Sequence, residues 1–490
     1  MKENIKGQPR NRKPDGRKGQ SPNKKPNPVA YEYTDEEYRR LLVKKQTEME
    51  KLLSGFAPVD PIVGMENPYY YRNKVCAEFR KLKNGTIISG RYQEGTHNVI
   101  ETKGCKIEDQ RADAIIQDIT GLFRSFKMMI YNEDSGYGLI RHVLIRTAHQ
   151  TGQIMVIIVT ASPVFPSKKN FANALLKLHP EITTIVQNIN TKDTNMVLGD
   201  RNQVIYGKGY IEDVLCGKRF RLSPGSFYQI NSVQTEKLYN KAIKYADLKK
   251  KETVIDAYCG IGTIGIVASD RAKRVIGVEL NAEAIRDAKI NSRMNKIENI
   301  EFYANDAGRF MVELADADEH IDVVFMDPPR SGSTEEFLSS VVALSPRKVV
   351  YISCGPDTLA RDLKYLTTHG YQVLKITPFD LFPFTEHTET VVLLSKGEID
   401  SKKIRVEFSL EDMDMSGFQK GATYEQIKAY VLEHTGLKVS SLYISQIKRK
   451  CGLDVGQNYN LSKKEDAKVP KCPPEKEAAI RDALKYFQMI

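Results

Sequence analysis

Cys354 and Glu389 are the residues of this chain whose types and positions best fit covalent chemistry. Cys354 ends the run Tyr351–Ser353 and precedes a Gly-Pro turn and a helix-like stretch. It therefore lies at the carboxyl end of a predicted buried strand, where open α/β sheets hold their ligands. Glu389 precedes the apolar run Val391–Leu394, a second predicted strand. A thiol and a carboxylate, each beside a strand of one sheet, are a candidate nucleophile and general base.

Each of these residues also has a simpler interpretation when it is taken alone. A cysteine at a strand end is usually a small buried hydrophobe. Glu389 alone would be a solvated carboxylate, and the nearby His387 would be a hydrogen-bonded structural residue. The surrounding motifs must therefore decide between chemistry and structure.

The composition is that of an ordinary globular protein. The chain has 490 residues, of which 41% are hydrophobic and 28% charged, enough for about two to four domains. No apolar run approaches the roughly 18 residues of a membrane span, so we expect a cytoplasmic protein without a membrane partner. The cysteines are scattered without a Cys-x-x-Cys pair, which favours reduced thiols and argues against a disulfide framework or a metal site. They are Cys76, Cys105, Cys216, Cys259, Cys354, Cys451 and Cys472.

The whole net charge of +11 lies at the two ends of the chain, and residues 29–400 are neutral. Residues 1–28 carry +7 and residues 401–490 carry +4. We predict a basic disordered arm over residues 1–30, which either neutralises RNA phosphates or only aids solubility. An apolar stripe that includes Leu41, Met49 and Leu53 predicts a charged amphipathic helix within residues 31–56.

Residues 57–221 alternate short β-rich segments with turns and predict an α+β domain. The expected strands are 75–79, 86–91, 139–146, 153–160, 183–189 and 203–207, with helices at 109–126 and 168–178. No catalytic constellation is evident in this region. We therefore expect a substrate (RNA) domain, and a structural role remains an alternative.

Residues 222–398 show regular βαβ alternation and predict a doubly wound, mostly parallel Rossmann-like sheet. The first strand leads into the glycine turn Tyr258–Gly262, and the second ends on Glu279. Such a turn and acid fit a nicotinamide dinucleotide as readily as S-adenosylmethionine. The fourth strand ends on Asp327-Pro328-Pro329-Arg330, an element for which a hydride-transferring enzyme has no evident need.

Five motifs in order give a specific resemblance. They are Phe227–Asn231, Asp256–Gly262, Asp327–Arg330, Ser353–Pro356 and His387–Glu389. Together they resemble the RNA uracil-C5-methyltransferase family, whose members methylate transfer and ribosomal RNA. The resemblance extends from about Tyr69 to Lys396.

The resemblance implies a role for each motif residue. By their positions in the family pattern, four residues would bind S-adenosylmethionine: Gln229, Tyr258, Glu279 and Asp327. Cys354 would add to carbon 6 of uracil, and Glu389 would remove the proton from carbon 5. Arg330 would stabilise charge on a uracil carbonyl oxygen. The target base would flip out of its stack to enter the pocket.

Three departures from the family pattern stand out. Gly355 replaces the asparagine that usually follows the nucleophile. Only Cys105 resembles a ligand of the iron-sulfur cluster that many ribosomal-RNA members carry, so we expect no cluster. The small β-barrel found at the start of those members is replaced here by the basic arm and the charged helix.

Residues 399–490 lie outside the family core. Helices are predicted over 424–434, 440–450 and 475–486, with basic residues 448–450 ending the second. This pattern fits a helix-turn-helix appendage that touches RNA. A helical cap that packs on the catalytic domain is an equal alternative.

We therefore predict an enzyme that makes 5-methyluridine in structured RNA, with 23S ribosomal RNA favoured over transfer RNA because of the basic arm and the extra carboxyl-terminal module. We expect no obligatory protein partner. An amino methyltransferase is disfavoured because Arg330 stands where that class has an aromatic residue, and because it needs no Cys354. An inert RNA-binding protein is the remaining alternative.

Overall fold

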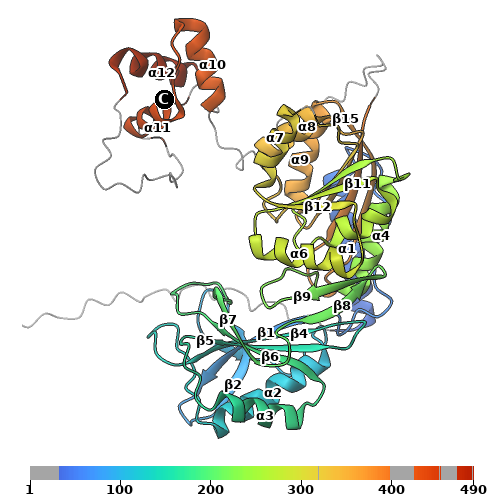
Figure 1. Cartoon of the computed structure of the whole chain (residues 1–490), viewed down its shortest axis with the longest axis vertical. Coiled ribbons are helices and arrows are strands. Elements are labelled where there is room, and N and C mark those ends of the chain that lie inside the picture. The colour runs from blue at the N-terminus through green and yellow to red at the C-terminus, as the bar shows by residue number, and fades with distance from the viewer. Residues whose placement is uncertain are drawn as a thin grey trace, which may run out of the picture. The chain divides into compact units, whose positions relative to one another are not determined.

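The computed structural model describes residues 33–317, 319–397, 424–451, 453, 472–487 and 489. The chain divides near residue 400 into two compact units (Figure 1). The predicted arm over residues 1–30 and the segment 398–423 lie outside the described residues. None of the described helices combines the length and apolar composition that a membrane span requires.

A seven-stranded sheet forms the centre of the second half of the first unit. Its strands, in spatial order, are β12 (Ile300–Ala304), β11 (Arg274–Glu279), β10 (Thr253–Ala257), β13 (Val323–Met326), β14 (Lys348–Ser353), β16 (Glu389–Lys396) and β15 (Tyr371–Phe379). The five strands from β12 to β14 are parallel, whereas β16 runs antiparallel to both β14 and β15. The prediction of a mostly parallel α/β sheet is confirmed.

Helices cover both faces of this sheet. They are α4 (Ser232–Ala246), α5 (Thr263–Ala268), α6 (Ala282–Met294), α7 (Ala307–Asp316), α8 (Glu335–Leu344) and α9 (Pro356–Thr368), with a 3-10 turn at Ser269–Arg271. Successive strand residues enter different cores: Val350 packs with the α4–α6 side and Tyr351 with the α7–α9 side. This alternation follows from the period of two in a strand and explains the near-continuous apolar sequence of the strands.

A second seven-stranded sheet occupies the first half of this unit. Its order is β3 (Val99–Glu101), β2 (Ile87–Tyr92), β1 (Lys74–Lys81), β4 (Ile140–Thr147), β5 (Ile154–Thr160), β6 (Ile182–Ile189) and β7 (Arg201–Tyr206). Helices α2 (Gln110–Ser125) and α3 (Lys168–Leu178) pack on one face of it (Figure 1). The hairpin β8 (Ile211–Leu215) and β9 (Lys218–Leu222) follows and contributes Ile211, Phe220 and Leu222 to the core of the other sheet.

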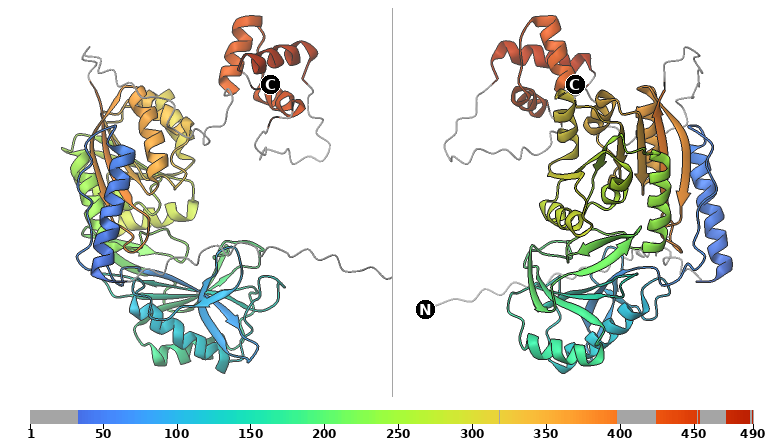
Figure 2. Two further views of the ribbon diagram at one scale, coloured as in Figure 1. Left: turned by 180° about the vertical axis from the view of Figure 1, so that it is seen from behind. Right: turned by 45° about the vertical axis from the view of Figure 1, so that its right-hand side comes forward.

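Helix α1 (Asp35–Leu53) begins at Thr34, whose side chain caps the backbone N–H of Glu37. It lies beside α9 and β15 (Figure 2). Its buried stripe includes Lys45, which is only 2% exposed. The Lys45 ammonium donates to Asp380 Oδ1 at 2.6 Å, to the carbonyl of Phe382 at 3.2 Å and to that of His387 at 2.7 Å. One cation from α1 therefore holds the loop that leads into β16.

The second unit contains three helices among its described residues. They are α10 (Tyr424–Thr435), α11 (Ser441–Lys450) and α12 (Pro474–Tyr486). Their core includes Val431, Ile444 and Ile480. Lys448 is buried, and Lys450 pairs with Glu477 at 2.6 Å. Two of the three basic residues that end α11 are therefore buried or already paired with an acidic residue.

Replacing Lys45 by Met should destabilise the protein by about 3–5 kcal/mol, because Asp380 would remain buried without its cation. Chemical denaturation of the full chain measures this loss. Lys44→Met is the matched control, since Lys44 is 52% exposed and pairs with Glu386, which is 67% exposed; that change should cost no more than about 1 kcal/mol. Adding Asp380→Asn to Lys45→Met should recover part of the loss. Equal effects of the two lysine changes would contradict this role of Lys45.

Candidate active site

The carboxyl ends of four parallel strands meet at one edge of the α/β sheet. Glu279 ends β11, Tyr258 follows β10, Asp327 follows β13 and Cys354 follows β14. The antiparallel strand β16 adds Glu389, its first residue. Because parallel strands present these ends on one side, five residues that are far apart in the sequence share one site.

The register of β14 and β16 brings the thiol and the carboxylate together. Ser353 pairs with Thr390 across the two antiparallel strands. Cys354 directly follows Ser353 at the end of β14, and Glu389 directly precedes Thr390 as the first residue of β16. The backbone ladder therefore sets these two side chains at adjacent strand ends, without a loop between them to vary their spacing.

A cavity of about 630 Å³ contains every residue that the sequence assigned to the site. Gln229, Tyr258, Glu279, Asp327, Arg330, Cys354 and Glu389 all line it. Glu389 and Gln229 are buried, Cys354 is partly exposed and Arg330 is exposed. Phe227 and Leu280 are large apolar side chains of the same lining that are 63% and 72% exposed. The lining of the cavity thus combines acidic side chains with exposed apolar side chains.

The turn after Cys354 fits closely against the Asp-Pro-Pro-Arg segment. The Gly355 N–H donates to Ser353 Oγ at 3.2 Å, and Pro356 begins α9. A Cβ atom on Gly355 would lie 2.9 Å from the carbonyl oxygen of Arg330 and 2.7 Å from Thr358 Oγ1. Since real Cβ atoms do not approach backbone so closely, this packing requires glycine where the family usually has asparagine.

Burial and mutual repulsion disfavour negative charge in the cavity. Desolvation, with the charges of Glu389 and Asp327, raises the pKa of Cys354 to about 11, while Arg330 opposes this shift. Burial raises the pKa of Asp327 to about 7. Burial and the Asp327 charge raise the pKa of Glu389 well above its usual value. The Oε2 atom of Glu389 has no hydrogen-bond partner, so this carboxyl group is free to meet a ligand.

Cys259 is the other thiol in the cavity lining. It is only 4% exposed, and its Sγ lies 3.8 Å from the carbonyl of Gly260. Burial raises its pKa well above the ordinary value. Cys354 is therefore the better placed of the two thiols to ionise and meet a substrate.

The turn after β10 supplies a surface for a nucleoside-bearing cofactor. Tyr258, Gly260 and Gly262 all have positive φ angles, and a Cβ on Gly260 would meet no protein atom within 4 Å. Glu279 orients the turn, because its Oε2 accepts the Gly260 N–H at 3.2 Å. An acid at the end of the second strand can accept hydrogen bonds from ribose hydroxyls. These residues fit S-adenosylmethionine.

The segment that carries Gln229 joins the two sheets. Asn73, just before β1, donates from its amide to the carbonyl of Gln229 at 2.9 Å and to Ser232 Oγ at 3.1 Å. Asn231 donates to the carbonyl of Leu381 at 2.9 Å. These hydrogen bonds thus connect the 227–231 motif both to the first half of the unit and to the loop before Glu389.

Sequence reasoning did not identify Lys45, Asp380 or Asn231 as supports of the site. A signal for Lys45 was present, because it occupies the apolar stripe of α1 between Leu41 and Met49 at spacings of four residues. A charge at such a position requires a buried partner. That partner, Asp380, lies too far along the chain to be paired by pattern.

Comparisons with known proteins identify the family of this chain. The family model described as tRNA (Uracil-5-)-methyltransferase matches residues 37–397. An uncharacterized RNA methyltransferase of Clostridium tetani is 43% identical over 337 residues, which are 69% of this chain and 73% of the relative. One of Bacillus cereus is 41% identical over 341 residues, covering 70% and 74%.

A solved structure extends the likeness to three dimensions. The tRNA (uracil-54, C5)-methyltransferase of Pyrococcus abyssi, in complex with S-adenosyl-L-homocysteine, is 26% identical. It covers 73% of this chain and 83% of its own, with a TM-score of 0.61. The chain therefore belongs to the tRNA (uracil-5-)-methyltransferase family and is an S-adenosylmethionine-dependent RNA (uracil-5)-methyltransferase.

Proposed function

We propose that this enzyme methylates carbon 5 of uridine in 23S ribosomal RNA through a covalent bond between Cys354 and carbon 6 of the base. The observation that carries this proposal is the strand register that sets Cys354 beside Glu389 in one cavity. A nucleophile and a base at adjacent strand ends can act on the two neighbouring carbons of one uracil ring.

The chemistry requires both side chains. Carbon 5 of uracil is a weak nucleophile. When the Cys354 thiolate adds to carbon 6, carbon 5 gains the nucleophilic character of an enolate carbon. Bound S-adenosylmethionine supplies the methyl group that carbon 5 takes. Glu389 then accepts the proton from carbon 5, the bond between carbon 6 and sulfur breaks, and the Cys354 thiolate leaves. A raised pKa makes the Glu389 carboxylate a stronger base for this step.

Arg330 and the cofactor residues complete the assignment. Arg330 lines the cavity and counteracts the rise in the Cys354 pKa, which suits a group that stabilises both the thiolate and charge on a uracil carbonyl oxygen. Glu279 and Tyr258 flank the glycine turn, while Asp327 and Gln229 supply polar groups to the cavity wall. We assign these four to the cofactor.

The choice of 23S ribosomal RNA rests on the two ends of the chain, which lie outside the two seven-stranded sheets and their helices. The +7 charge over residues 1–28 and the additional helices α10–α12 suit a large folded RNA. Transfer RNA is the second candidate, because the related structure from Pyrococcus abyssi bears the name of a transfer-RNA enzyme. We place the reaction in the cytoplasm.

A direct comparison of unmodified transcripts tests the substrate. The full chain should form 5-methyluridine faster in 23S ribosomal RNA than in transfer RNA at equal nucleotide concentration. Digestion to nucleosides and mass spectrometry identify the product, with Cys354→Ala as the inactive control. Faster methylation of transfer RNA would reverse the assignment.

Cofactor affinity should rise with pH across about pH 6 to 8. Asp327, with its pKa raised to about 7, loses a proton in this range, and the resulting negative charge attracts the sulfonium of S-adenosylmethionine. S-adenosylhomocysteine has a neutral sulfur, so its affinity should change less. Isothermal titration calorimetry at several pH values measures both ligands. Asp327→Asn should flatten the dependence for S-adenosylmethionine; equal pH slopes for the two ligands would contradict this role of Asp327.

A further inference from the structure

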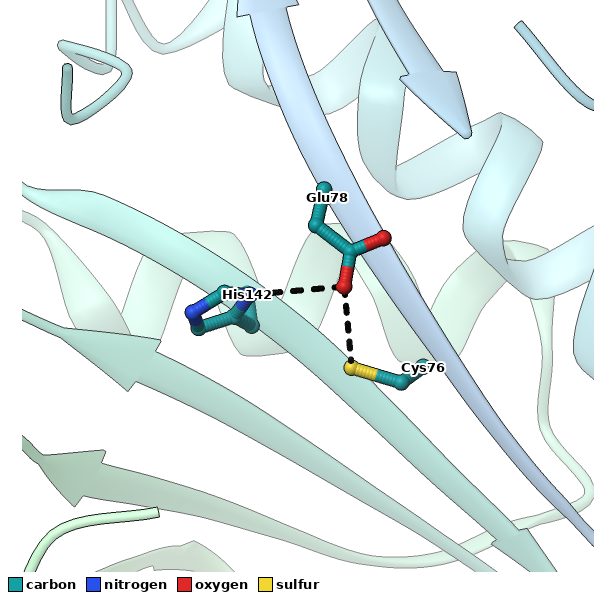
Figure 3. A group of neighbouring side chains, drawn as sticks. All are labelled: Cys76, Glu78 and His142. Carbon is teal, nitrogen blue, oxygen red and sulfur yellow. Dashed lines mark hydrogen bonds and ion pairs between the residues drawn. The ribbon is translucent and has the colours of Figure 1, made fainter. Parts of the chain in front are cut away.

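A thiol, a carboxylate and an imidazole meet on the sheet of the first half of the chain. Cys76 and Glu78 alternate on β1 and share one face, while Glu78 pairs directly with His142 of β4. Val75, Ala77 and Phe79 point to the opposite face, where α2 and α3 pack. Figure 3 shows the three side chains converging from two strands.

Their separations suit a shared metal ion. Cys76 Sγ lies 3.7 Å from Glu78 Oε1, and His142 Nδ1 lies 3.8 Å from the same oxygen. One ligand atom from each residue lies within 4.8 Å of the other two. Ligands of tetrahedral zinc are about 3.3–3.8 Å apart, from metal-ligand distances of about 2.0–2.3 Å. Small side-chain shifts would bring the three atoms to that geometry.

Two polar atoms of this group lack partners. His142 is 5% exposed and Glu78 is 9% exposed. His142 Nδ1 and Glu78 Oε2 are both buried without a hydrogen bond. A separation of 3.8 Å between Nδ1 and the carboxylate is too long for one. Buried nitrogen and oxygen atoms of this kind are expected to have a partner.

The local charge balance also favours a cation. Glu108 pairs with Arg91, and Glu133 pairs with Arg141 at 2.7 Å. Among the described residues, no lysine or arginine nitrogen lies within 4.0 Å of Glu78, and Arg91, which pairs with Glu108, acts on it only from further away. A buried carboxylate without such a partner is costly, and a metal ion would neutralise it.

Glu133 lies near the other nitrogen of the imidazole. Its Oε1 is 4.0 Å from Nε2 of His142, which is beyond hydrogen-bond distance but could be closed by a small movement of either side chain. Histidines that bind metal through one nitrogen commonly donate from the other to a carboxylate, which fixes the ring. Nδ1 is thus the nitrogen placed for a metal.

We propose that Cys76, Glu78 and His142 bind one divalent transition-metal ion, with zinc the best match to this sulfur, oxygen and nitrogen set. Binding replaces the thiol proton, which leaves to solvent, by a bond between the metal and the Cys76 thiolate. The fourth position remains open to water. None of the three residues lines the catalytic cavity, so the ion joins β1 to β4 and takes no part in methyl transfer. A site with one thiolate is not an iron-sulfur site. The spacing of the cysteines in the sequence did not indicate the proposed zinc site.

Cobalt provides the test, because Co²⁺ replaces Zn²⁺ and absorbs light when a thiolate binds it. The full chain, stripped with a chelator, should bind one Co²⁺ and show the thiolate-to-cobalt charge-transfer band. Cys76→Ser should lose this band, and Cys105→Ser, the matched control, should keep it. Glu133→Gln should keep the band with roughly tenfold weaker affinity.

Stability gives a readout that does not depend on colour. Zinc should raise the melting temperature of the stripped wild-type chain and leave that of His142→Gln unchanged. Absence of the charge-transfer band in the folded wild-type chain would overturn the proposal, as would an equal band in Cys76→Ser. Either result would mean that the Cys76 thiolate holds no metal ion at this site.

Discussion

Among the groups of the active cavity that become negative on ionisation are Cys354, Asp327 and Glu389, whose pKa values are all raised. Each resists ionisation, because burial raises its pKa, and neighbouring negative charges raise those of Cys354 and Glu389 further. Among the described residues of the lining, Arg330 alone carries a positive charge. The cavity is therefore suited to a cationic cofactor and to reaction steps in which one group ionises at a time. This electrostatic constraint accounts for the types of residue that the site uses.

The fold satisfies this constraint through backbone pairing. The ladder between β14 and β16 sets the thiol beside the carboxylate, and the parallel strands bring Asp327 to the same edge. The loop before Glu389 is held by Lys45 from α1 and by Asn231 before α4. Precise placement of a base depends on such supporting contacts, because catalysis tolerates little error in position. Helix α1, although far from the site in sequence, is part of its support.

Much of the catalytic sheet could be predicted from the sequence, because most of its strands are apolar runs bounded by turns. Tyr258, Glu279, Asp327, Arg330 and Cys354 could be placed at one edge of the sheet because each ends or follows a predicted strand. Glu389 precedes a predicted strand, and Gln229 was assigned through the family resemblance. The short strands β3, β8 and β9 were missed. In the β8–β9 hairpin, Cys216 and Gly217 form the turn with positive φ angles, and a cysteine is not a usual signal for such a turn.

Contacts between distant segments could not be predicted. The pairing of Lys45 with Asp380 and the meeting of Cys76 with His142 depend on which strands and helices lie side by side, and a single sequence does not encode register locally. The need for Gly355 likewise depends on the approach of the Arg330 carbonyl. The binding of RNA by residues 57–221 stays a prediction, and so do the domain boundaries.

The central claim is that Cys354 adds to the base before Glu389 removes its proton. Glu389→Gln tests it most directly, since glutamine matches the size of glutamate but is no base at neutral pH. With RNA and S-adenosylmethionine, this variant should accumulate a covalent, methylated adduct that migrates slowly on a denaturing gel, and adding Cys354→Ala should abolish the band. Absence of an adduct under conditions in which the wild-type enzyme methylates RNA, or its persistence without Cys354, would contradict the mechanism.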